Sequence, residues 1–468
     1  MHFIPALALG LLSATFSGIA ADGVHDLSFG VDPGITTLSF AQSDQGDDDL
    51  AQVLIDPNGK LYLVGTTRNS GRRAYTVTRL LADGSPDASY KNGGALISMP
   101  PGESRDFTAT SSALQLDGKL TVAGYVQIEA DDGDRDLMIC RFTPGGDLDP
   151  GFGSATLLGY AGCEQYAFAS GGNAWDMPLD ILVQPNGRIV IAGLTTRPGN
   201  RHSGLFMRLL PDGKLDTSFY GLDAVADGWS AYPAIDSPDS GGIKFSALTR
   251  QADGSLIIGA YAGGEGGEID DAVLTKNVII VAAADGVFDG AVSGLDFGAG
   301  AAKLRTQLTD VISETDDTII AVGSQETSPG RFLGGIAKYS LPGFALDKTF
   351  SGDGLVAYEF CELCSDTRLM SAALQQDGKL LVGGVIKTDR YRSFVARILP
   401  TGSFDHSFGS GGVTHIDLQT AVGDESLRSI SLQAGRSVLA GRAFKSAGDG
   451  AFAVARLSND GIFASDLE

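Results

Sequence analysis

Gln115-Leu-Asp-Gly-Lys-Leu-Thr-Val-Ala-Gly124 is an Asp-Gly turn that leads into a short apolar strand ending in Gly. Further along, Cys140-Arg-Phe-Thr-Pro-Gly-Gly-Asp-Leu-Asp149 adds a strand and a second Gly-rich turn, and Phe152-Gly153 follows. The same unit recurs with a period of about 60 residues and contains only strands and turns, which is typical of a β-propeller blade. The repeat therefore predicts the fold before any other feature is considered.

The first turn of the unit occurs seven times, at Asn58-Gly59, Asp117-Gly118, Asn186-Gly187, Asp253-Gly254, Asp316-Asp317, Asp377-Gly378 and Ala434-Gly435. Such turns between apolar runs predict hairpins of type I′, which need positive φ at both central residues. The following strand is apolar at nearly every position, which indicates a sheet covered on both faces. A Gly closes most of these strands and predicts a bend or a close approach of neighbouring sheets. These glycines are Gly65, Gly124, Gly193, Gly323, Gly384 and Gly441.

The second turn ends in Asp-x-Ser/Thr-aromatic, as in Asp87 to Tyr90 and Asp216 to Phe219. We expect the Asp to accept backbone N–H groups and the aromatic ring to fill the seam between two blades. Unit four departs from this pattern, because Asp289-Gly-Ala-Val follows its Asp285-Gly286 turn.

The two ends of the chain carry complementary halves of one unit. The last unit stops just past its second turn, and Asp26-Leu-Ser-Phe-Gly30 with the apolar run Ile35 to Phe40 supplies the missing half. We therefore predict an all-β fold, a seven-bladed β-propeller of four-stranded antiparallel blades. The N-terminal strand joins the C-terminal blade and closes the ring, which removes the open sheet edges. The propeller domain is expected to span residues 21–468.

Residues 1–20 resemble a secretory signal peptide. An apolar run from Phe3 to Leu12 is followed by small residues and Gly18-Ile19-Ala20, which is typical of cleavage after Ala20. The run is too short to span a bilayer. We expect a secreted or periplasmic protein, a monomer without a membrane span once the signal is removed.

Four cysteines in an exported chain predict disulfides. Cys361 can close on Cys364 and Cys140 on Cys163, which is one of three pairings that the sequence leaves open. Redox catalysis by Cys361-Glu-Leu-Cys364 is a weaker alternative outside a βαβ context, and two isolated thiolates fall short of a zinc site.

The composition restricts the partners. The chain has 468 residues, 64 of them Gly, and a formal net charge of -23. Such a surface repels phosphate backbones and anionic membranes, so nucleic acid is not expected as a partner. Cations and cationic partners are favoured instead.

The motifs Asp-Gly-Lys-Leu-x-Val-Ala-Gly and Asp-Gly-x-Leu-Asp-x-Ser-Phe-Gly resemble the delta-60 repeat family of bacterial secreted propellers, related in style to NHL propellers. The resemblance covers about residues 26–466, and units four, five and seven depart from it. It implies a propeller with no assigned reaction, so no catalytic residue carries over.

Motifs of hydrolases, zinc proteases and nucleotide-binding sites are absent from the sequence, and we assign no catalytic and no metal-binding residue. Asp132-x-Asp134-x-Asp136 begins like a calcium loop, but Leu137 stands where the Gly belongs. A solvated acidic loop is the preferred interpretation, and calcium is the only cofactor kept as an alternative.

The connections Gly159 to Pro178 and Ala226 to Lys244 are long and carry both tryptophans. We expect them on one variable face, where Trp175, Trp229, Tyr166 and Tyr232 bind a ligand or else pack as local core. Acidic residues just before the innermost strands form a ring at the channel mouth or else cap their own turns. These residues are Asp48, Asp106, Asp176, Asp366 and Asp424.

The preferred functional hypothesis is an exported, non-catalytic propeller that binds a protein or glycan ligand on this variable face. One alternative is a hydrolase or lyase that uses carboxylates in the central funnel. The other is a structural component of a cell-surface assembly.

Overall fold

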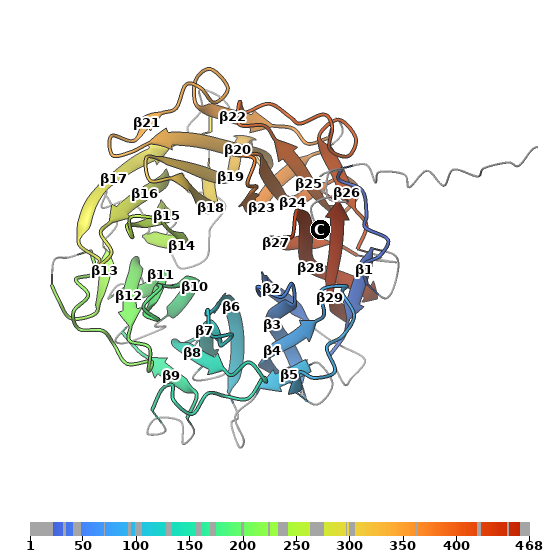
Figure 1. The fold of residues 1–468 in the computed structure, drawn as a ribbon. Helices are drawn as coiled ribbons and strands as arrows, with labels where there is room; N and C mark the ends of the chain where they lie inside the picture. The colour runs from blue at the N-terminus through green and yellow to red at the C-terminus, as the bar shows by residue number, and fades with distance from the viewer. Residues whose placement is uncertain are drawn as a thin grey trace, which may run out of the picture.

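The structure is a computed structural model that describes residues 22–30, 34–40, 48–69, 71–91, 95–98, 105–127, 133–154, 161–168, 175–197, 201–222, 225–232, 242–262, 276–295, 297–298, 305–361, 364–418, 423–446 and 449–458. These residues form seven antiparallel sheets arranged as blades around a central axis (Figure 1). The predicted seven-bladed propeller is therefore confirmed. The predicted signal peptide lies outside the described residues.

Each blade begins with its innermost strand and ends with its outermost strand. Blade 1 consists of β2 (Asp49–Ile55), β3 (Leu61–Asn69), β4 (Arg72–Leu80) and β5 (Ala95–Ser98). Blade 2 consists of β6 (Asp106–Leu114), β7 (Leu120–Gln127), β8 (Arg135–Phe142) and β9 (Cys163–Tyr166). Blade 3 consists of β10 (Asp176–Val183), β11 (Ile189–Arg197), β12 (Arg201–Leu209) and β13 (Trp229–Tyr232). Blade 4 consists of β14 (Ile243–Arg250), β15 (Leu256–Ala262), β16 (Lys276–Ala282) and β17 (Phe288–Leu295). Blade 5 consists of β18 (Thr306–Thr315), β19 (Thr318–Ser328) and β20 (Arg331–Ser340), and both β21 (Ala345–Leu346) and β22 (Leu355–Tyr358) pair with β20. Blades 6 and 7 consist of β23 (Asp366–Leu374), β24 (Leu380–Lys387), β25 (Tyr391–Ile398) and β26 (Val413–Ile416); and β27 (Ser426–Gln433), β28 (Arg436–Ser446), β29 (Asp449–Ser458) and β1 (Ile35–Leu38).

The N-terminal segment closes the ring, as predicted. Strand β1 pairs antiparallel with β29, with Ile35 opposite Ala455 and Leu38 opposite Phe452. The residues before β1 also supply the second turn of blade 7, because the Gly23 N–H donates to the Ser458 carbonyl at 2.6 Å. Blade 7 is thus assembled from both ends of the described chain, and β1 covers the edge that β29 would otherwise expose.

The first turns differ from the prediction in their backbone conformation. In blade 1 the Gly59 N–H donates to the Asp56 carbonyl at 2.9 Å, and Gly59 alone of the Asn58-Gly59 pair has positive φ, at 77°. This is a type I turn followed by a Gly bulge, in which the Gly restores the strand twist that a type I turn would lose. Among the described first turns, only Ala434-Gly435 has positive φ at both central residues, at 44° and 78°. The type I′ prediction is therefore wrong for the Asn-Gly and Asp-Gly copies and holds for the copy with the least typical sequence.

The second turns join neighbouring blades through a buried charge pair. In blade 1, the Arg79 Nε donates to Asp87 at 2.8 Å, and its guanidinium lies 4.6 Å from the centre of the Tyr90 ring. The Arg79 Nη1 reaches the Pro144 carbonyl of blade 2 at 2.7 Å. Asp87 also accepts the Ser89 N–H at 3.0 Å, and Tyr90 is fully buried. Both predicted roles of the Asp-x-Ser-aromatic motif are confirmed in this blade.

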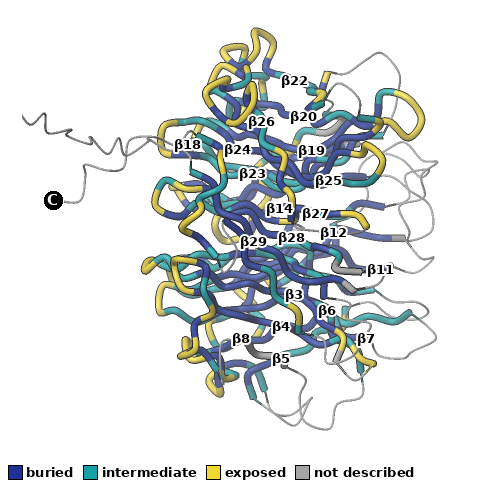
Figure 2. Tube along the Cα trace, turned by 90° about the vertical axis from the view of Figure 1, so that its right-hand side faces the viewer, coloured by how far each residue is buried: buried dark blue, intermediate teal, exposed yellow. Residues whose placement is uncertain are grey.

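The core consists of the faces where successive blades pack on one another. Figure 2 shows the strands as mostly buried and the exposed residues gathered in turns at the edges of the disk. This explains why the middle strands are apolar on both faces. Among the described residues, no helix is long or apolar enough to cross a membrane.

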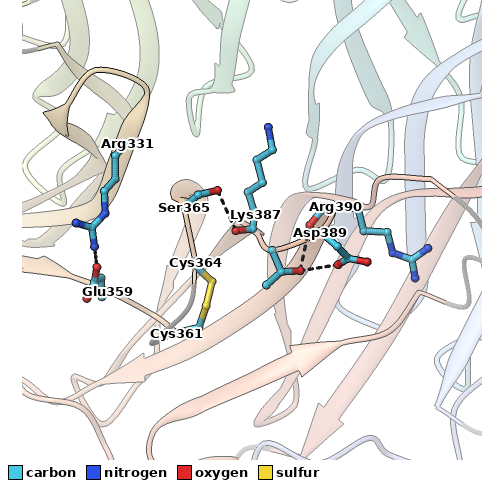
Figure 3. The surroundings of a disulfide bond; sticks show 9 residues. Arg331, Glu359, Cys361, Cys364, Ser365, Lys387, Asp389 and Arg390 are labelled. Atoms are coloured by element: carbon cyan, nitrogen blue, oxygen red, sulfur yellow. Dashed lines mark hydrogen bonds and ion pairs between the residues drawn. A yellow bond between two sulfur atoms is a disulfide. The ribbon is translucent and has the colours of Figure 1, made fainter.

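The four cysteines form two disulfides. Cys140 of β8 bonds Cys163 of β9, directly across the two outer strands of blade 2. Cys361 bonds Cys364 in the connection between β22 and β23, near the Arg331–Glu359 ion pair (Figure 3). Of the three pairings that the sequence allowed, this is the one that the fold brings together.

Candidate functional site

Every innermost strand carries one extra residue at the same position. The pairing of each innermost strand with its neighbour shifts register at this position, which leaves a β-bulge facing the central channel. The β18–β19 pair has a second shift, between Ser313 and Thr315. The bulge residues are Ala51, Thr110, Leu179, Ser246, Thr309, Met370 and Arg428. The seven bulges set which side chains line the channel.

The glycines that close the second strands make these bulges possible. A Cβ on Gly384 would lie 1.9 Å from the Arg368 carbonyl oxygen of the bulged strand, and one on Gly124 would lie 2.0 Å from the Thr108 oxygen. Six of the seven blades have this Gly, and blade 4 has Ala260 opposite its bulge. These contacts lie within a blade. The predicted approach of a neighbouring sheet is found at Gly65 and Gly124, where a Cβ would lie 2.5 Å from the Phe452 ring and 2.8 Å from the Tyr75 hydroxyl.

A polar cavity of about 370 Å³ lies within this ring of bulges. Residues from the innermost strands of all seven blades line it, with the Tyr261 side chain added from β15. The lining is rich in hydroxyl, amide and carboxylate groups, and Arg428 is its one cation among the described residues. The volume falls within the range of small-molecule sites.

In six of the seven blades, the side chain of the residue after the bulge hydrogen-bonds a neighbouring blade. The Gln52 Oε1 accepts the Ser112 N–H at 2.8 Å, and the Ser371 Oγ accepts the Ile430 N–H at 3.2 Å. The same position holds Asp180 in blade 3, Ala247 in blade 4 and Asp310 in blade 5. The polar side chains of this set form hydrogen bonds between blades around the channel, and Ala247 interrupts the series in blade 4.

Two of these connecting residues are carboxylates. The Asp180 Oδ2 accepts the Leu248 N–H at 2.7 Å, and its Oδ1 lies 3.0 Å from the Ser111 hydroxyl. The Asp310 Oδ2 accepts the Ala372 N–H at 2.9 Å. Burial raises the pKa of Asp180 to about 6. Burial and the negative charge of Asp180 raise the pKa of Asp310 to about 7.

The sequence contained a signal for these two residues that the motif search did not use. In blades 1 to 6, the post-bulge residue stands six positions before the Asn or Asp of the first turn, as Asp180 does before Asn186 and Asp310 before Asp316. Aligning the units on their turns therefore places Asp180 and Asp310 at one position of the innermost strand. What the alignment lacks is the bulge, which turns that position toward the channel.

The predicted ligand-binding aromatics lie away from this cavity in strands or in packing contacts. Trp175 stacks with His202 at 5.4 Å, and the Arg135 guanidinium lies 4.2 Å from its ring centre. The Tyr166 hydroxyl donates to the Gly213 carbonyl of blade 3. In the same way, Tyr358 donates to Gly402, so this contact repeats between blades.

Trp229 and Tyr232 are the first and last residues of β13. Trp229 packs on Phe168 at 4.3 Å, and Tyr232 lies between Phe245 and Phe288 at 6.1 and 6.4 Å. The prediction that they stand on a loop is wrong, as it is for Tyr166 in β9, because the connections contain the outermost strands. Whether a ligand contacts these rings stays a prediction. Tyr160, a further aromatic of the connection from Gly159 to Pro178, lies outside the described residues.

The predicted acidic residues each accept a hydrogen bond near the start of an innermost strand. Asp48 accepts the Phe40 N–H at 2.8 Å, Asp106 the Arg73 N–H at 3.2 Å, Asp176 the Phe168 N–H at 2.6 Å, Asp366 the Tyr391 hydroxyl at 3.1 Å and Asp424 the Tyr391 N–H at 2.8 Å. The donors lie 8 to 33 positions from these acids, so the contacts are not the local turn caps of the second alternative. A role in ligand binding stays a prediction for all of them.

The calcium alternative also stays untested, because Asp132 lies outside the described residues. Asp136 accepts the Gln165 Nε2 at 2.5 Å, and burial raises its pKa. Within the described part of the chain, no three His, Cys, Asp or Glu residues are grouped so that they can hold a metal ion.

Four of the seven units match a family model described as "Domain of unknown function (DUF5122) beta-propeller". The match covers residues 57–90, 115–152, 184–219 and 375–408, which run from first turn to second-turn aromatic in blades 1, 2, 3 and 6. It supports assignment to a β-propeller repeat family. No curated protein matches the chain.

Solved structures with similar folds have little sequence in common with the chain. Sqt1 from Chaetomium thermophilum is 11% identical, with 86% of this chain and 82% of that chain covered and a TM-score of 0.40. An ulvan lyase is 8% identical, with 94% and 95% covered and a TM-score of 0.46. A Trypanosoma rangeli sialidase is 10% identical, with 92% and 59% covered and a TM-score of 0.39. At this level of similarity, we draw no functional conclusion from them.

Proposed function

We propose that the protein is an exported, non-catalytic binding propeller whose central cavity takes an amine-bearing group of a protein or glycan ligand. Asp180 and Asp310 supply the negative charge for the ammonium group, and the hydroxyl and amide groups of the lining supply hydrogen bonds. The net charge of -23 favours the approach of such a ligand.

The observation that carries the proposal is that other blades have neutral residues at the positions that Asp180 and Asp310 occupy in blades 3 and 5. Gln52, Ser371 and Ser429 accept the same inter-blade N–H without a charge, the last at 3.3 Å from Val53 N. The hydrogen bonds of the ring therefore do not require a carboxylate. Burying two carboxylates where neutral side chains serve lowers stability, as their raised pKa values indicate. A cationic ligand that binds to the negative charge would explain why Asp180 and Asp310 are carboxylates at these positions.

Export is part of the proposal. Residues 1–20 would act as a signal peptide, and residues 21–468 would form one propeller domain that functions as a monomer outside the cytoplasm. The two disulfides support this, because such bonds persist in oxidising compartments.

The binding test uses two probes, glucosamine and a tripeptide that contains lysine and is acetylated only at its N-terminus, so that the lysine ammonium group is free. The two probes distinguish a glycan source of the amine from a protein source. Calorimetry at pH 8 should show binding by the wild type. Replacement of both carboxylates by the residue of blades 6 and 7, in Asp180→Ser with Asp310→Ser, should weaken binding more than about tenfold, since charged hydrogen bonds are lost. Asp117→Asn, which removes one negative charge from the surface, should leave binding unchanged. Equal binding by both variants would contradict the proposal.

The same double variant tests the charges through stability. A raised folded-state pKa means that the folded protein holds more protons than the unfolded chain between about pH 4 and pH 7. The stability contributed by these protonated groups is present below about pH 4 and is lost as the pH rises through 6 and 7. The free energy of unfolding of the double variant relative to that of the wild type should therefore rise between about pH 4 and about pH 7 and stay constant above pH 7. Urea unfolding at pH 4, 6 and 8 measures the difference, and a difference independent of pH would contradict the burial of these charges.

A hydrolase or lyase is the second candidate. The observation in its favour is that two carboxylates with pKa values of about 6 and 7 occupy one cavity, a range suited to general acid–base catalysis. Oligosaccharides built from glucosamine are incubated with the wild type and analysed by mass spectrometry. An enzyme would give cleavage products that the double variant does not form. A structural role in a surface assembly would instead leave all these probes unbound and intact.

A further inference from the structure

The Asp of the second turn binds basic side chains in six of the seven blades. In blade 1 it is Asp87, which pairs with Lys60, the residue just before β3, and with Arg79 of β4, both at 2.8 Å. Blades 2, 3, 6 and 7 repeat this arrangement, and blade 5 uses Lys338 with Asp347 at 3.5 Å. The repeated pairs are Lys119 and Arg141 with Asp149, Arg188 and Arg208 with Asp216, Lys379 and Arg397 with Asp405, and Arg436 and Arg456 with Asp26.

Blade 4 keeps the acid and lacks both basic residues. The hydrogen bond from Gly286 N to the Ala283 carbonyl, at 2.8 Å, aligns this turn with Gly84 and Leu81 of blade 1. By that alignment, Asp289 stands in the place of Asp87, Val281 in the place of Arg79 and Ser255 in the place of Lys60. The carboxylate is therefore present without the guanidinium and the ammonium group that accompany it elsewhere.

A cavity of about 160 Å³ marks this position at the seam between blades 4 and 5. Val281, Ser255 and Asp289 all line it, as do the carboxylates Asp253, Asp316 and Asp317. Asp289 is exposed, so the cavity can be reached from solvent. The place that basic side chains fill in other blades is thus an acidic pocket here.

The other groups that contact the arginine in complete blades are also retained. In blade 7, the Arg456 Nη1 donates to the Gln433 Oε1 at 2.8 Å and to the Ala82 carbonyl of the next blade at 2.6 Å. Gln251, the equivalent of Gln433, lines the blade 4 pocket, and so do Leu341 and Pro342 in the second turn of blade 5.

An aromatic ring is present as well. In complete blades the guanidinium lies over the second-turn aromatic, as Arg456 does over Phe29 at 4.7 Å. Blade 4 has Val292 at that position, but Phe344 of blade 5 lines the pocket.

We propose that this pocket receives the arginine side chain of a protein partner, in the place that the chain's own arginine occupies in the complete blades. A guanidinium there meets a carboxylate, an amide oxygen and an aromatic ring, the same set that binds Arg456 internally. The inference goes beyond the central cavity and depends on other residues, so either proposal can fail alone.

The test is fluorescence anisotropy with a labelled peptide of sequence Gly-Gly-Arg-Gly-Gly, blocked at both ends, and a matched peptide with citrulline in place of arginine. Citrulline has the same shape without the charge. The wild type should bind the arginine peptide at least about tenfold more tightly than the citrulline peptide. Asp289→Asn, a change of an exposed residue, should remove that preference, and Asp117→Asn should preserve it.

Val281→Arg is the second variant. It restores the internal arginine, so it should raise the thermal midpoint and abolish peptide binding. Asp289→Asn keeps the proposal testable if Val281→Arg does not fold. Equal binding of the two peptides, or unchanged binding in a folded Val281→Arg variant, would overturn the proposal. Displacement of the arginine peptide by millimolar calcium chloride would indicate a general cation site and would also overturn it.

Discussion

Arg397 shows how single residues hold charge inside this fold. Its side chain is fully buried, yet its Nε reaches Asp405 at 2.8 Å and its Nη2 reaches Asp22 at 2.7 Å. The guanidinium also lies 4.9 Å from the centre of the Phe408 ring. Asp405 accepts further hydrogen bonds from Ser407, and its pKa is lowered to about 2 despite its burial. A planar cation with several donors can satisfy all these partners at once, which a lysine cannot do.

Arg397→Ala should lower the free energy of unfolding by about 3–5 kcal/mol, because it leaves two carboxylates near the interior without their cation. Urea unfolding at pH 7 measures the change. Lys214→Ala is the matched control, because Lys214 also pairs with an aspartate, Asp212 at 2.8 Å, but on the surface. The control should change stability by less than about 1 kcal/mol. Similar losses in both variants would contradict a special role for the buried pair.

At the scale of the element, the bulged innermost strand distinguishes each blade from a regular four-stranded antiparallel sheet. The bulge bends the strand, and the post-bulge side chain then connects it to the next blade through a backbone N–H. In six blades a Cβ on the neighbouring strand would meet the backbone of the bulged strand, which explains the Gly at the end of the second strand. Blade 4 forms its bulge opposite Ala260 instead. One local device thus serves the sheet, the channel and the contact between blades.

Gly384→Ala should destabilise the protein by about 1–3 kcal/mol, because its Cβ would lie 1.9 Å from a backbone oxygen of the bulged strand. Thermal unfolding followed by circular dichroism measures the shift. The control is Gly343→Ala, where no atom lies within 4 Å of the added Cβ. A neutral Gly384→Ala would show that the bulge can move away at little cost.

At the scale of the whole molecule, blade 7 depends on contacts between residues more than 370 positions apart. The Arg397 contact with Asp22 spans 375 positions, and the Arg456 contact with Asp26 spans 430. The N-terminal segment supplies both carboxylates, the aromatic Phe29 and the outer strand β1 (Figure 1). Ring closure therefore couples the two ends of the described chain to the stability of the last blade.

Removal of residues 22–40 should lower the thermal midpoint by about 10 °C or more, because it exposes the edge of β29 and leaves Arg397 and Arg456 without these partners. Calorimetry measures the midpoint, and light scattering measures association through the exposed edge. Addition of a synthetic peptide of residues 22–40 should restore the midpoint. The same peptide with Asp26→Ala and Phe29→Ala should restore it less. An unchanged midpoint after removal would show that the ring is stable without its closing segment.

Much of the fold could be predicted because its signals are local. The turns at Asn58-Gly59 and its equivalents, the apolar strands after them and the Asp-x-Ser-aromatic endings depend on neighbouring residues only. Ring closure could be predicted too, because two incomplete halves stood at the two ends. The type I′ assignment failed because an Asn-Gly pair fits both a two-residue turn and a longer turn with a Gly bulge, and strand register decides between them.

The candidate site could be predicted only in part. Trp175, Trp229 and Tyr232 stood out as rare aromatics in long connections, but the sequence does not show whether a ring faces solvent or a neighbouring blade. Asp180 and Asp310 did not stand out among the many acids of the chain. They differ from the other acids because the preceding bulge turns them toward the channel, where residues of the five other blades complete the cavity around them.

The sequence by itself determined the seven units, their turns and the completion of the last blade by the first strand, because each follows from hydrogen bonds and apolar patterns within one unit or between two matching halves. Only the tertiary structure decided which carboxylates meet in the channel and which blade lacks its arginine pair at a solvent-accessible seam. Both depend on the stacking of separate blades, which brings together residues about 60 positions apart or more, and no pattern within a single unit records that contact.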